Sequence, residues 1–508
     1  MKKIIILVYF ITSFNLISQV SISPKILWER TYLTGKTNPN DQEILPLTVQ
    51  ETFDKSLLIK AYRYDINSAI LKTNSNGEKI WLSTIGDSSM TPIYPISINF
   101  NRTDNIIKFR GLWTGFGSGG VFSIGSINYL NGDTSNFYLK KGKDDFNKTL
   151  PLVCNTNENG LFLSFNSGGY KSPSDSGKKF YYFRKLDEKD SLVWRDSLSF
   201  PDSVQSGSGI VIRTNDDGYL FTSVLLYPTI SRRLIMVKYN SSLKLDWVKY
   251  YDNYENVKGL VQTPDGGYVI CVVNSEGAIM PKQPVSYLLK FDSKGEKSWQ
   301  KSFSLDDFTD LRSLHFLNNK LGFVISGTLA KKGVWNNGPP NLGRYYLYGS
   351  KKFLLMTTDL LGNITSTNIW QPDTLDCNPS DAIQTSDGNF VVVGEKVKST
   401  YTTTQDNLPF GYVAKIENQI SEVQNENKQN NIKSEISGNK LKIIFTSLEK
   451  PIKINLYDLN GKSLFERTLS NNQKKMDIDL SNFVTGYYFI NLIYENHKIE
   501  TKKIIYEK

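Results

Sequence analysis

A compound repeat runs through most of the chain and constrains its fold more than any other feature. Each copy contains an apolar stretch, a Thr/Asn-x-Asp/Asn-Gly turn and an apolar run with an aromatic residue. A segment of the form apolar-Lys-apolar-Asp/Asn-x-x-Gly-x-x-x-Trp follows after a variable gap. The clearest copy is VQTPDGGYVICVV at 261–273 with YLLKFDSKGEKSW at 287–299. Self-similarity of this kind predicts a repeat architecture in which each copy is one structural unit.

The spacing of tryptophans gives the length of the unit. Successive spacings are 53, 113, 53, 52 and 71 residues along Trp28, Trp81, Trp194, Trp247, Trp299 and Trp370. We interpret the 342 residues between the first and the last as six units of about 57 residues. A unit of this size holds four short strands, which is typical of a β-propeller blade. The periodic tryptophans are then expected to pack between blades.

The ends of the repeat predict a closed ring. The last copy stops at 414–418 without a fourth strand, whereas KILWERTYLTG at 25–35 is a fourth strand with no unit before it. Joining the two removes the open sheet edges of a linear array. We therefore expect an all-β fold with a seven-bladed β-propeller at 19–417, in which the N-terminal strand closes the last blade. The weak second copy at 96–111 leaves six and eight blades as alternatives.

Both ends of the chain differ from the repeat. Residues 1–18, MKKIIILVYFITSFNLIS, place two lysines before an apolar core and a small polar residue, which predicts a signal peptide and a mature chain beginning near Gln19. Residues 418–431 are rich in Asn, Gln and Glu and predict a linker. Residues 432–508 alternate apolar and polar positions between short turns, which predicts a small Ig-like β-sandwich.

The motifs INLYDLNGKSLF, IDLSNFVTGYYFINL and KIETKKIIYEK of this C-terminal domain occur in order. They resemble the type A C-terminal sorting domain of bacterial type IX (Por) secretion. The matching positions are Tyr457, Asp458, Gly461, Ile478, Leu480, Gly486, Tyr488, Lys502 and Lys503. The resemblance implies export, recognition by the type IX translocon and its sorting machinery, and cleavage. The product would be secreted or attached to the outer face of the outer membrane. Without the resemblance, an accessory adhesion domain is the alternative.

Charge and residue usage argue against several classes of site. The net charge of +10 is spread along the chain without a basic run, so no nucleic-acid partner is expected. Cys154, Cys271 and Cys377 are far apart and are expected to be small buried hydrophobes. With only His315 and His497, neither a metal cage nor a triad with a positioned imidazole is expected. We expect no metal and no cofactor.

Insertions between the second and third strands of several units predict a binding face. In an up-and-down blade these loops lie on one face, and long loops on a rigid scaffold often carry function. The candidate binding residues are Trp113, Tyr170, Trp335, Arg344, Tyr346 and Tyr401. Aromatic rings with polar neighbours suit a glycan or a protein surface. The alternative is that the rings cap the blades and pack on one another.

The sequence favours a non-catalytic binding or adhesion protein, expected to be a monomer, over an enzyme. It has no GxSxG, HExxH or P-loop motif. The carboxylate pairs Asp216-Asp217 and Asp306-Asp307 fall in repeat turns or connectors, so they are poor candidates for acid–base chemistry. A secreted hydrolase or lyase with carboxylates in the central channel remains the alternative, and a scaffold without a small ligand is a third possibility.

Overall fold

The computed structural model divides into two units, Met1–Asn418 and Gln419–Lys508. It describes residues 24–33, 44–62, 68–85, 93–101, 106–113, 121–141, 152–158, 160–166, 179–189, 191–200, 205–226, 232–274, 285–305, 308–330, 335–336, 345–346, 351–373, 375–397, 410–418, 432–445, 451–457, 463–470, 473–484, 486–493 and 499–506. The predicted signal peptide, and the linker after Asn418, lie outside these residues. The described residues form strands and turns and contain no helix that could cross a membrane.

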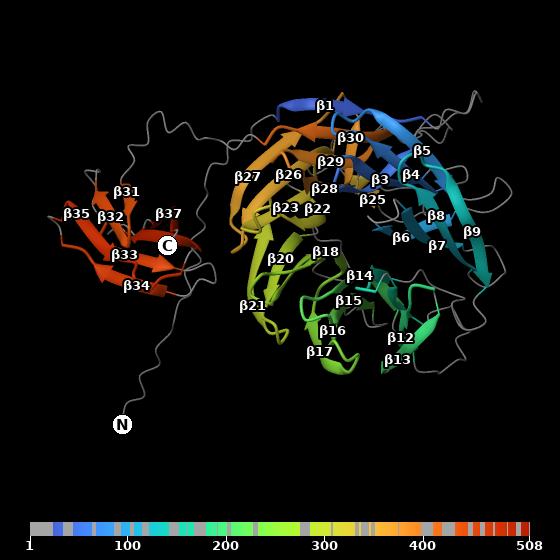
Figure 1. The fold of residues 1–508 in the computed structure, drawn as a ribbon, viewed down its shortest axis with the longest axis horizontal. Coiled ribbons are helices and arrows are strands. Elements are labelled where there is room, and N and C mark those ends of the chain that lie inside the picture. The colour runs from blue at the N-terminus through green and yellow to red at the C-terminus, as the bar shows by residue number, and fades with distance from the viewer. Residues whose placement is uncertain are drawn as a thin grey trace. The chain divides into compact units, whose positions relative to one another are not determined.

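Small four-stranded antiparallel sheets build the first unit, as the repeat predicted. The first four are β2–β5 (Leu45–Glu51, Leu57–Tyr62, Ser68–Thr73, Lys79–Ile85), β6–β9 (Ile93–Asn101, Ile106–Trp113, Val121–Asn128, Thr134–Lys141), β10–β13 (Leu152–Asn155, Leu161–Asn166, Lys179–Leu186, Leu192–Phe200) and β14–β17 (Gln205–Arg213, Tyr219–Leu226, Arg232–Tyr239, Leu245–Asp252). Figure 1 shows the sheets of this unit arranged in a ring, which is consistent with a propeller.

The remaining sheets of the first unit depart from a simple meander at two points: the pair β24-β25 is inserted between β23 and β26, and β1 joins the last sheet. These remaining sheets are β18–β21 (Asn256–Gln262, Tyr268–Asn274, Val285–Phe291, Lys297–Phe303), β22-β23-β26-β27 (Phe308–Phe316, Gly322–Ala330, Lys352–Asp359, Ile364–Trp370), β28-β29-β30-β1 (Asp376–Gln384, Phe390–Val397, Phe410–Ile416, Ile26–Arg30) and the short pair β24-β25 (Trp335–Asn336, Tyr345–Tyr346). Strand β1 pairs with β30, with Glu29 opposite Ala414. It is therefore the fourth strand that the last copy lacked.

Tryptophans of the outer strands pack on glycines of the neighbouring sheet. Trp247 in β17 contacts Gly295, which follows β20 and has φ +79°. A Cβ on Gly295 would lie 2.9 Å from the Trp247 ring. The same arrangement joins Trp28 to Gly77, Trp81 to Gly132 and Trp299 to Gly362. The tryptophan and the glycine of the repeat thus form one contact between adjacent units, and Trp28 of β1 makes it at the point of closure.

The Trp–Gly contact is altered at Trp194 and is not made by Trp370. Trp194 packs near Leu243, which replaces the glycine and has φ 59°. Our use of Trp370 as a further copy was wrong: Trp370 pairs with Phe353, whereas the periodic tryptophans lie opposite the repeat lysines. An insertion carrying β24 and β25 lengthens this unit. Trp370 instead donates a hydrogen bond from its indole nitrogen to the Tyr412 hydroxyl at 3.1 Å.

In five of the four-stranded sheets of the first unit, an ion pair fixes the first turn. In the clearest copy, the amine of Lys290 in the third strand lies 2.7 Å from a carboxylate oxygen of Asp265. The Thr263 hydroxyl and the amide of Gly267 also donate hydrogen bonds to that carboxylate. Equivalent ion pairs join Lys72 to Asp54, Lys185 to Glu158, Lys238 to Asp216 and Lys415 to Asp387. Both charged residues of the motif are therefore structural.

The second unit contains two sheets around one apolar core. One sheet has the order β31-β32-β35 (Ile432–Ser437, Lys440–Phe445, Lys475–Asp479), and the other β34-β33-β36-β37 (Ser463–Thr468, Lys453–Tyr457, Gly486–Ile493, Ile499–Tyr506). Alternate residues point inward, as expected for half-buried strands. Leu441 and Ile478 of the first sheet and Ile454, Ile490 and Tyr506 of the second belong to this core.

We expect Gly295→Ala to destabilise the first unit more than Gly266→Ala. Both glycines have φ +79°, so both variants carry the cost of a left-handed alanine, about 1–2 kcal/mol. Only at residue 295 does the new methyl group meet the Trp247 ring, which should add about 1–3 kcal/mol. Equilibrium urea denaturation of the full chain measures both changes. Equal losses would show that the Trp–Gly contact does not stabilise the unit.

Candidate functional site

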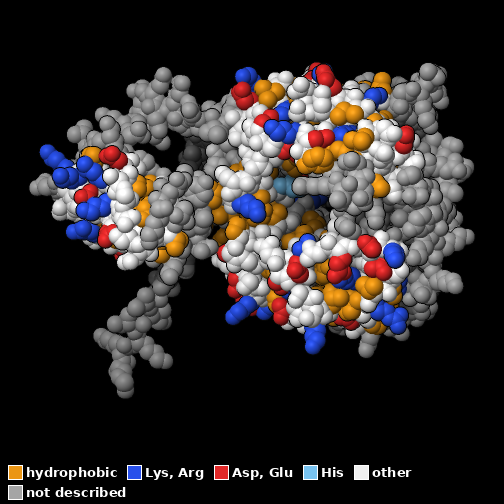
Figure 2. All heavy atoms as spheres, in the orientation of Figure 1, with side chains coloured by type: hydrophobic (Ala, Val, Ile, Leu, Met, Phe, Trp, Pro, Cys, Tyr) orange, Lys and Arg blue, Asp and Glu red, His pale blue; other side chains and the backbone are white. Residues whose placement is uncertain are grey.

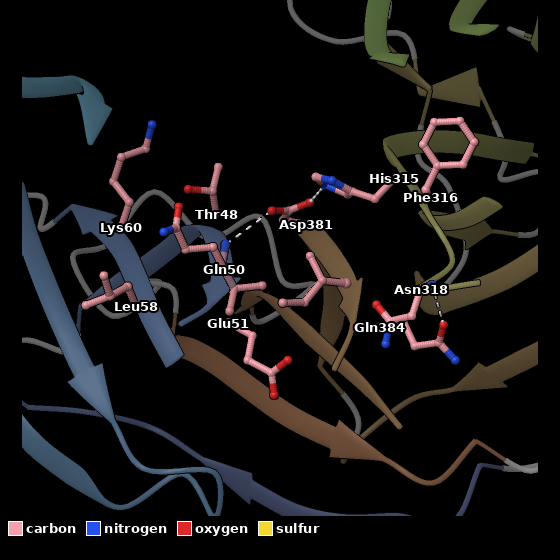
Figure 3. Close-up of a pocket in the computed structure, with 12 residues that line it drawn as sticks. Thr48, Gln50, Glu51, Leu58, Lys60, His315, Phe316, Asn318, Asp381 and Gln384 are labelled. Atoms are coloured by element: carbon pink, nitrogen blue, oxygen red, sulfur yellow. Dashed lines mark hydrogen bonds and ion pairs between the residues drawn. The ribbon is translucent and has the colours of Figure 1, made fainter. Parts of the chain in front are cut away.

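A pocket of about 560 Å³ lies where three sheets of the first unit meet. Its lining comes from the C-terminal halves of the first strands β2, β22 and β28 and from the start of β3 (Figure 3). The residues used below are Thr48, Gln50, Glu51, Lys60, His315 and Asp381. Figure 2 shows a hollow near the centre of the ring and charged side chains of both signs scattered over the face in view.

Asp381 is the buried centre of the pocket. The strand is irregular between Pro379 and Asp381, and a bulge of this kind redirects the side chain that follows it. The Asp381 side chain is 5% exposed. One carboxylate oxygen lies 2.6 Å from Nε2 of His315 and accepts the amide of Ala382 at 2.9 Å. The other accepts the amide of Val49 at 3.1 Å. These bonds compensate the burial of its charge.

The Asp381 carboxylate orients the imidazole of His315 and raises its pKa. The imidazole is 43% exposed, so its free edge faces the pocket while Nε2 faces the carboxylate. Burial would lower the pKa of His315, but the negative charge of Asp381 and the hydrogen bond to it raise the pKa above its usual value. A histidine held in this way can donate a proton or carry positive charge near neutral pH.

Lys60 supplies a second cationic group from strand β3. Burial lowers the pKa of its amine, and the negative charge of Asp381 opposes this effect. Thr48 and Gln50 lie between Lys60 and Asp381 in the close-up (Figure 3). The carboxylate of Glu51 is engaged elsewhere: it accepts the amide of Ser386 at 2.6 Å and its hydroxyl at 3.0 Å.

More charged residues lie on first strands, in β18 and β22, and on the second strand β29. Irregularities at Val257/Gly259 and Leu311/Ser313 flank Lys258 in β18 and Arg312 in β22. Arg312 lies 2.6 Å from Asp310. Glu395 of β29 accepts a hydrogen bond from Asn378 at 3.3 Å. Burial raises the pKa of Glu395, opposed by Asn378, Arg312 and Lys351.

The predicted binding residues lie elsewhere or are not described. Loops between second and third strands are at the opposite strand ends from the pocket, because the pocket lies next to the turns between first and second strands. Trp335 and Tyr346 are register partners in the β24-β25 pair. Trp113 ends β7. Tyr170, Arg344 and Tyr401 fall outside the described residues. The binding face therefore stays a prediction.

Sequence reasoning missed the pairing of His315 with Asp381. It expected no positioned imidazole and did not single out Asp381. Counted back from the turn, His315 stands where other copies carry Ile212, Val261 and Ile383. A polar residue at an apolar position of the repeat was the available signal. The two candidate carboxylates Asp216 and Asp217 pair with Lys238 and Arg213 in a turn, and Asp306-Asp307 lies outside the described residues.

The sorting motif contributes mainly to the second unit's strands. Tyr457 ends β33, Gly486 begins β36, and Lys502 and Lys503 lie in β37 opposite Ile490 and Phe489. Tyr488 is buried, and its hydroxyl donates a hydrogen bond to the carbonyl of Val484 at 2.6 Å. Asp458 and Gly461 are outside the described residues. Tyr488 is therefore a core residue whose hydroxyl ties the strand to the preceding turn.

Comparison with known families identifies the second unit. Residues 437–507 match the family model of the secretion system C-terminal sorting domain. This chain therefore carries a type IX sorting domain, and that domain marks it as secreted or attached to the cell surface. The machinery of type IX secretion is the partner that the domain implies. No curated protein matches the chain in sequence.

Solved structures resemble the chain only in fold. The polysaccharide lyase Uly1 has 10% identity and a TM-score of 0.47, with coverage of 77% of this chain and 99% of that one. Drosophila Semaphorin 1b, extracellular domains 1–2, has 10% identity and a TM-score of 0.42, covering 89% and 95%. A Dyadobacter fermentans protein of unknown function has 8% identity and a TM-score of 0.41, covering 77% and 98%. None of these likenesses bears on the activity of this chain.

We expect the pKa of His315 to lie above the usual value of about 6.5 and to fall when Asp381 is replaced by Asn. The stabilising charge interaction is present below the raised pKa and is lost as the pH rises through it. The chain has two histidines, so His497→Gln leaves His315 as a single imidazole signal for NMR titration. The Asp381→Asn variant is titrated in the same background. An unchanged pKa in that variant would contradict the role given to the carboxylate.

Proposed function

We propose that the chain is a non-catalytic binding or adhesion protein of the cell exterior, whose first unit contacts a glycan or a protein. In this proposal the first unit is a seven-bladed propeller and the second is an Ig-like sorting domain at 432–508. Residues 1–18 are a signal peptide and 418–431 a linker that is left after sorting. The observation that carries the binding function is the pocket formed by β2, β22 and β28, where polar side chains from separate sheets converge.

The pocket has the composition of a ligand site. Such sites combine a cleft or cavity with a few convergent polar groups, and the volume of about 560 Å³ falls in their usual range. Thr48 and Gln50 are exposed, and their side chains make no hydrogen bond to another described residue. Their hydroxyl and amide groups suit the hydroxyls of a sugar or the polar groups of a peptide. The aromatic loops predicted from the sequence would extend the contact on the other face.

A second candidate function is a hydrolase or lyase that acts on an extracellular polymer. The pairing of His315 with the buried Asp381 favours it, because a carboxylate that orients an imidazole is a recurring arrangement in acid–base catalysis. Glu395, whose pKa is raised by burial, is a further candidate acid. The binding hypothesis is preferred because both oxygens of Asp381 are already satisfied within the protein and the described pocket lacks a second unengaged carboxylate.

The proposed export route and location are tested by determining the termini of the mature protein. We expect mass spectrometry of the protein from a type IX-competent host to find a product that begins near Gln19 and ends within 418–434, in the medium or on the cell surface. The sorting domain is removed in the process that the resemblance implies. A periplasmic protein with an intact C-terminus would contradict the proposed route, and the second unit would then be a working domain of its own.

Binding and catalysis are separated by one set of variants. We expect Gln50→Ala to weaken ligand binding about tenfold, the loss of one or two hydrogen bonds, without any product being formed. Trp335→Ala with Tyr346→Ala reports on the loop face. Leu361→Ala is the control, because Leu361 is an exposed apolar residue on the turn between β26 and β27 and does not line the pocket. Isothermal calorimetry measures affinity, and chromatography of the incubated polymer detects cleavage. Polymer cleavage that is abolished by His315→Ala would instead establish the enzyme hypothesis.

A further inference from the structure

The carboxylates of the pocket are already engaged by the protein. Asp381 accepts hydrogen bonds at both oxygens, from the backbone of β2 and β28 and from His315. Glu51 accepts two from Ser386 of the adjacent sheet. A ligand cation would have to compete with these bonds, and separating Asp381 from its partners would leave a buried charge uncompensated. The described pocket therefore offers little to a basic ligand.

The donors of the pocket are, in contrast, available. Among the described residues, Lys60 has no carboxylate within the 4 Å of an ion pair; its electrostatic partner is the more distant, already bonded Asp381. Gln50 and Thr48 lie beside it with unused hydrogen-bonding capacity. Asp381 of β28 is the charged group in contact with His315, and Lys60 of β3 and Glu51 of β2 line the same pocket. A lysine held in a partly buried pocket without a close counter-ion is stabilised by any anion that enters.

We infer that this pocket binds the carboxylate of an acidic sugar residue, with Lys60 as its ionic partner and Gln50 and Thr48 as hydrogen-bonding groups. The inference rests on the proposed binding function and names its ligand class. The site is a half-open hollow lined by side chains from three sheets. That shape accommodates a sugar ring, whereas an extended peptide is more often held along the exposed edge of a strand. His315 adds positive charge when it is protonated.

The test uses the full chain and three probes of similar length. These are an oligogalacturonate of four residues, a neutral maltotetraose and a tetra-aspartate peptide. We expect the oligogalacturonate to bind, and Lys60→Gln to weaken it at least tenfold, because the variant removes a charge-assisted hydrogen bond. Lys25→Gln, at an exposed ion pair with Glu417, is the charge-matched control and should leave affinity unchanged. Gln50→Ala provides a second pocket variant if Lys60→Gln does not fold.

The pH dependence gives an independent readout. Affinity for the oligogalacturonate should fall as the pH rises through the raised pKa of His315, and this dependence should move to lower pH in Asp381→Asn. Binding of maltotetraose alone would overturn the anionic ligand while the proposed glycan-binding function stands. Binding of the peptide alone, or oligogalacturonate binding unaffected by both pocket variants, would also overturn it. Absence of binding by all three probes would contradict both this inference and the proposed use of the pocket.

Discussion

The ring of sheets depends on a lysine that is mostly buried beneath the first turn in five of its sheets. In the clearest copies Lys238 and Lys290 have side chains that are 4% and 10% exposed, and each reaches a turn aspartate, Asp216 or Asp265. Burying an ammonium group is costly unless a counter-charge and hydrogen bonds accompany it. The carboxylate meets this requirement and also accepts hydrogen bonds from the turn itself. One interaction therefore fixes the shape of the turn and ties it to the third strand of the same sheet.

The sheet that begins with β22 lacks this ion pair, and its first turn contributes to the candidate site. In the sheet that begins with β22, Thr357 stands where other copies have the lysine, and its turn has Asn318 and Asn319 in place of an aspartate. The lysine and the aspartate of the motif are thus both absent from this sheet. Asn318 instead contacts the next sheet: its amide donates to Gln384 at 2.9 Å and its side chain to the carbonyl of Thr385 at 2.6 Å. Both Asn318 and Gln384 line the pocket.

Much of the architecture could be predicted because it is local and repeated. The Trp–Gly contact, the turn glycines and the two-residue strand periodicity each recur at fixed spacing, so single copies reinforce one another. The pairing of β1 with β30 followed from a missing strand at one end and an extra strand at the other. The site could not be predicted in this way, since it is built from residues that break the repeat. His315 and Asp381 are 66 residues apart and meet only because their strands are neighbours in the ring. Trp370 was wrongly counted as a copy for a related reason, because the insertion that carries β24 and β25 changed the spacing of the repeat in this unit.

The charges of the pocket bear on binding and catalysis in opposite ways. A general base must be able to release the proton it takes, and a histidine whose protonated form is stabilised by Asp381 holds that proton more strongly as its pKa rises. The same stabilisation favours an imidazolium that contributes positive charge to a site for anions. Lys60 contributes a second positive charge. Asp381 repels an anionic ligand less than a free carboxylate would, because it accepts hydrogen bonds from His315 and two backbone amides. The arrangement therefore suits recognition of an acidic group more directly than it suits proton abstraction.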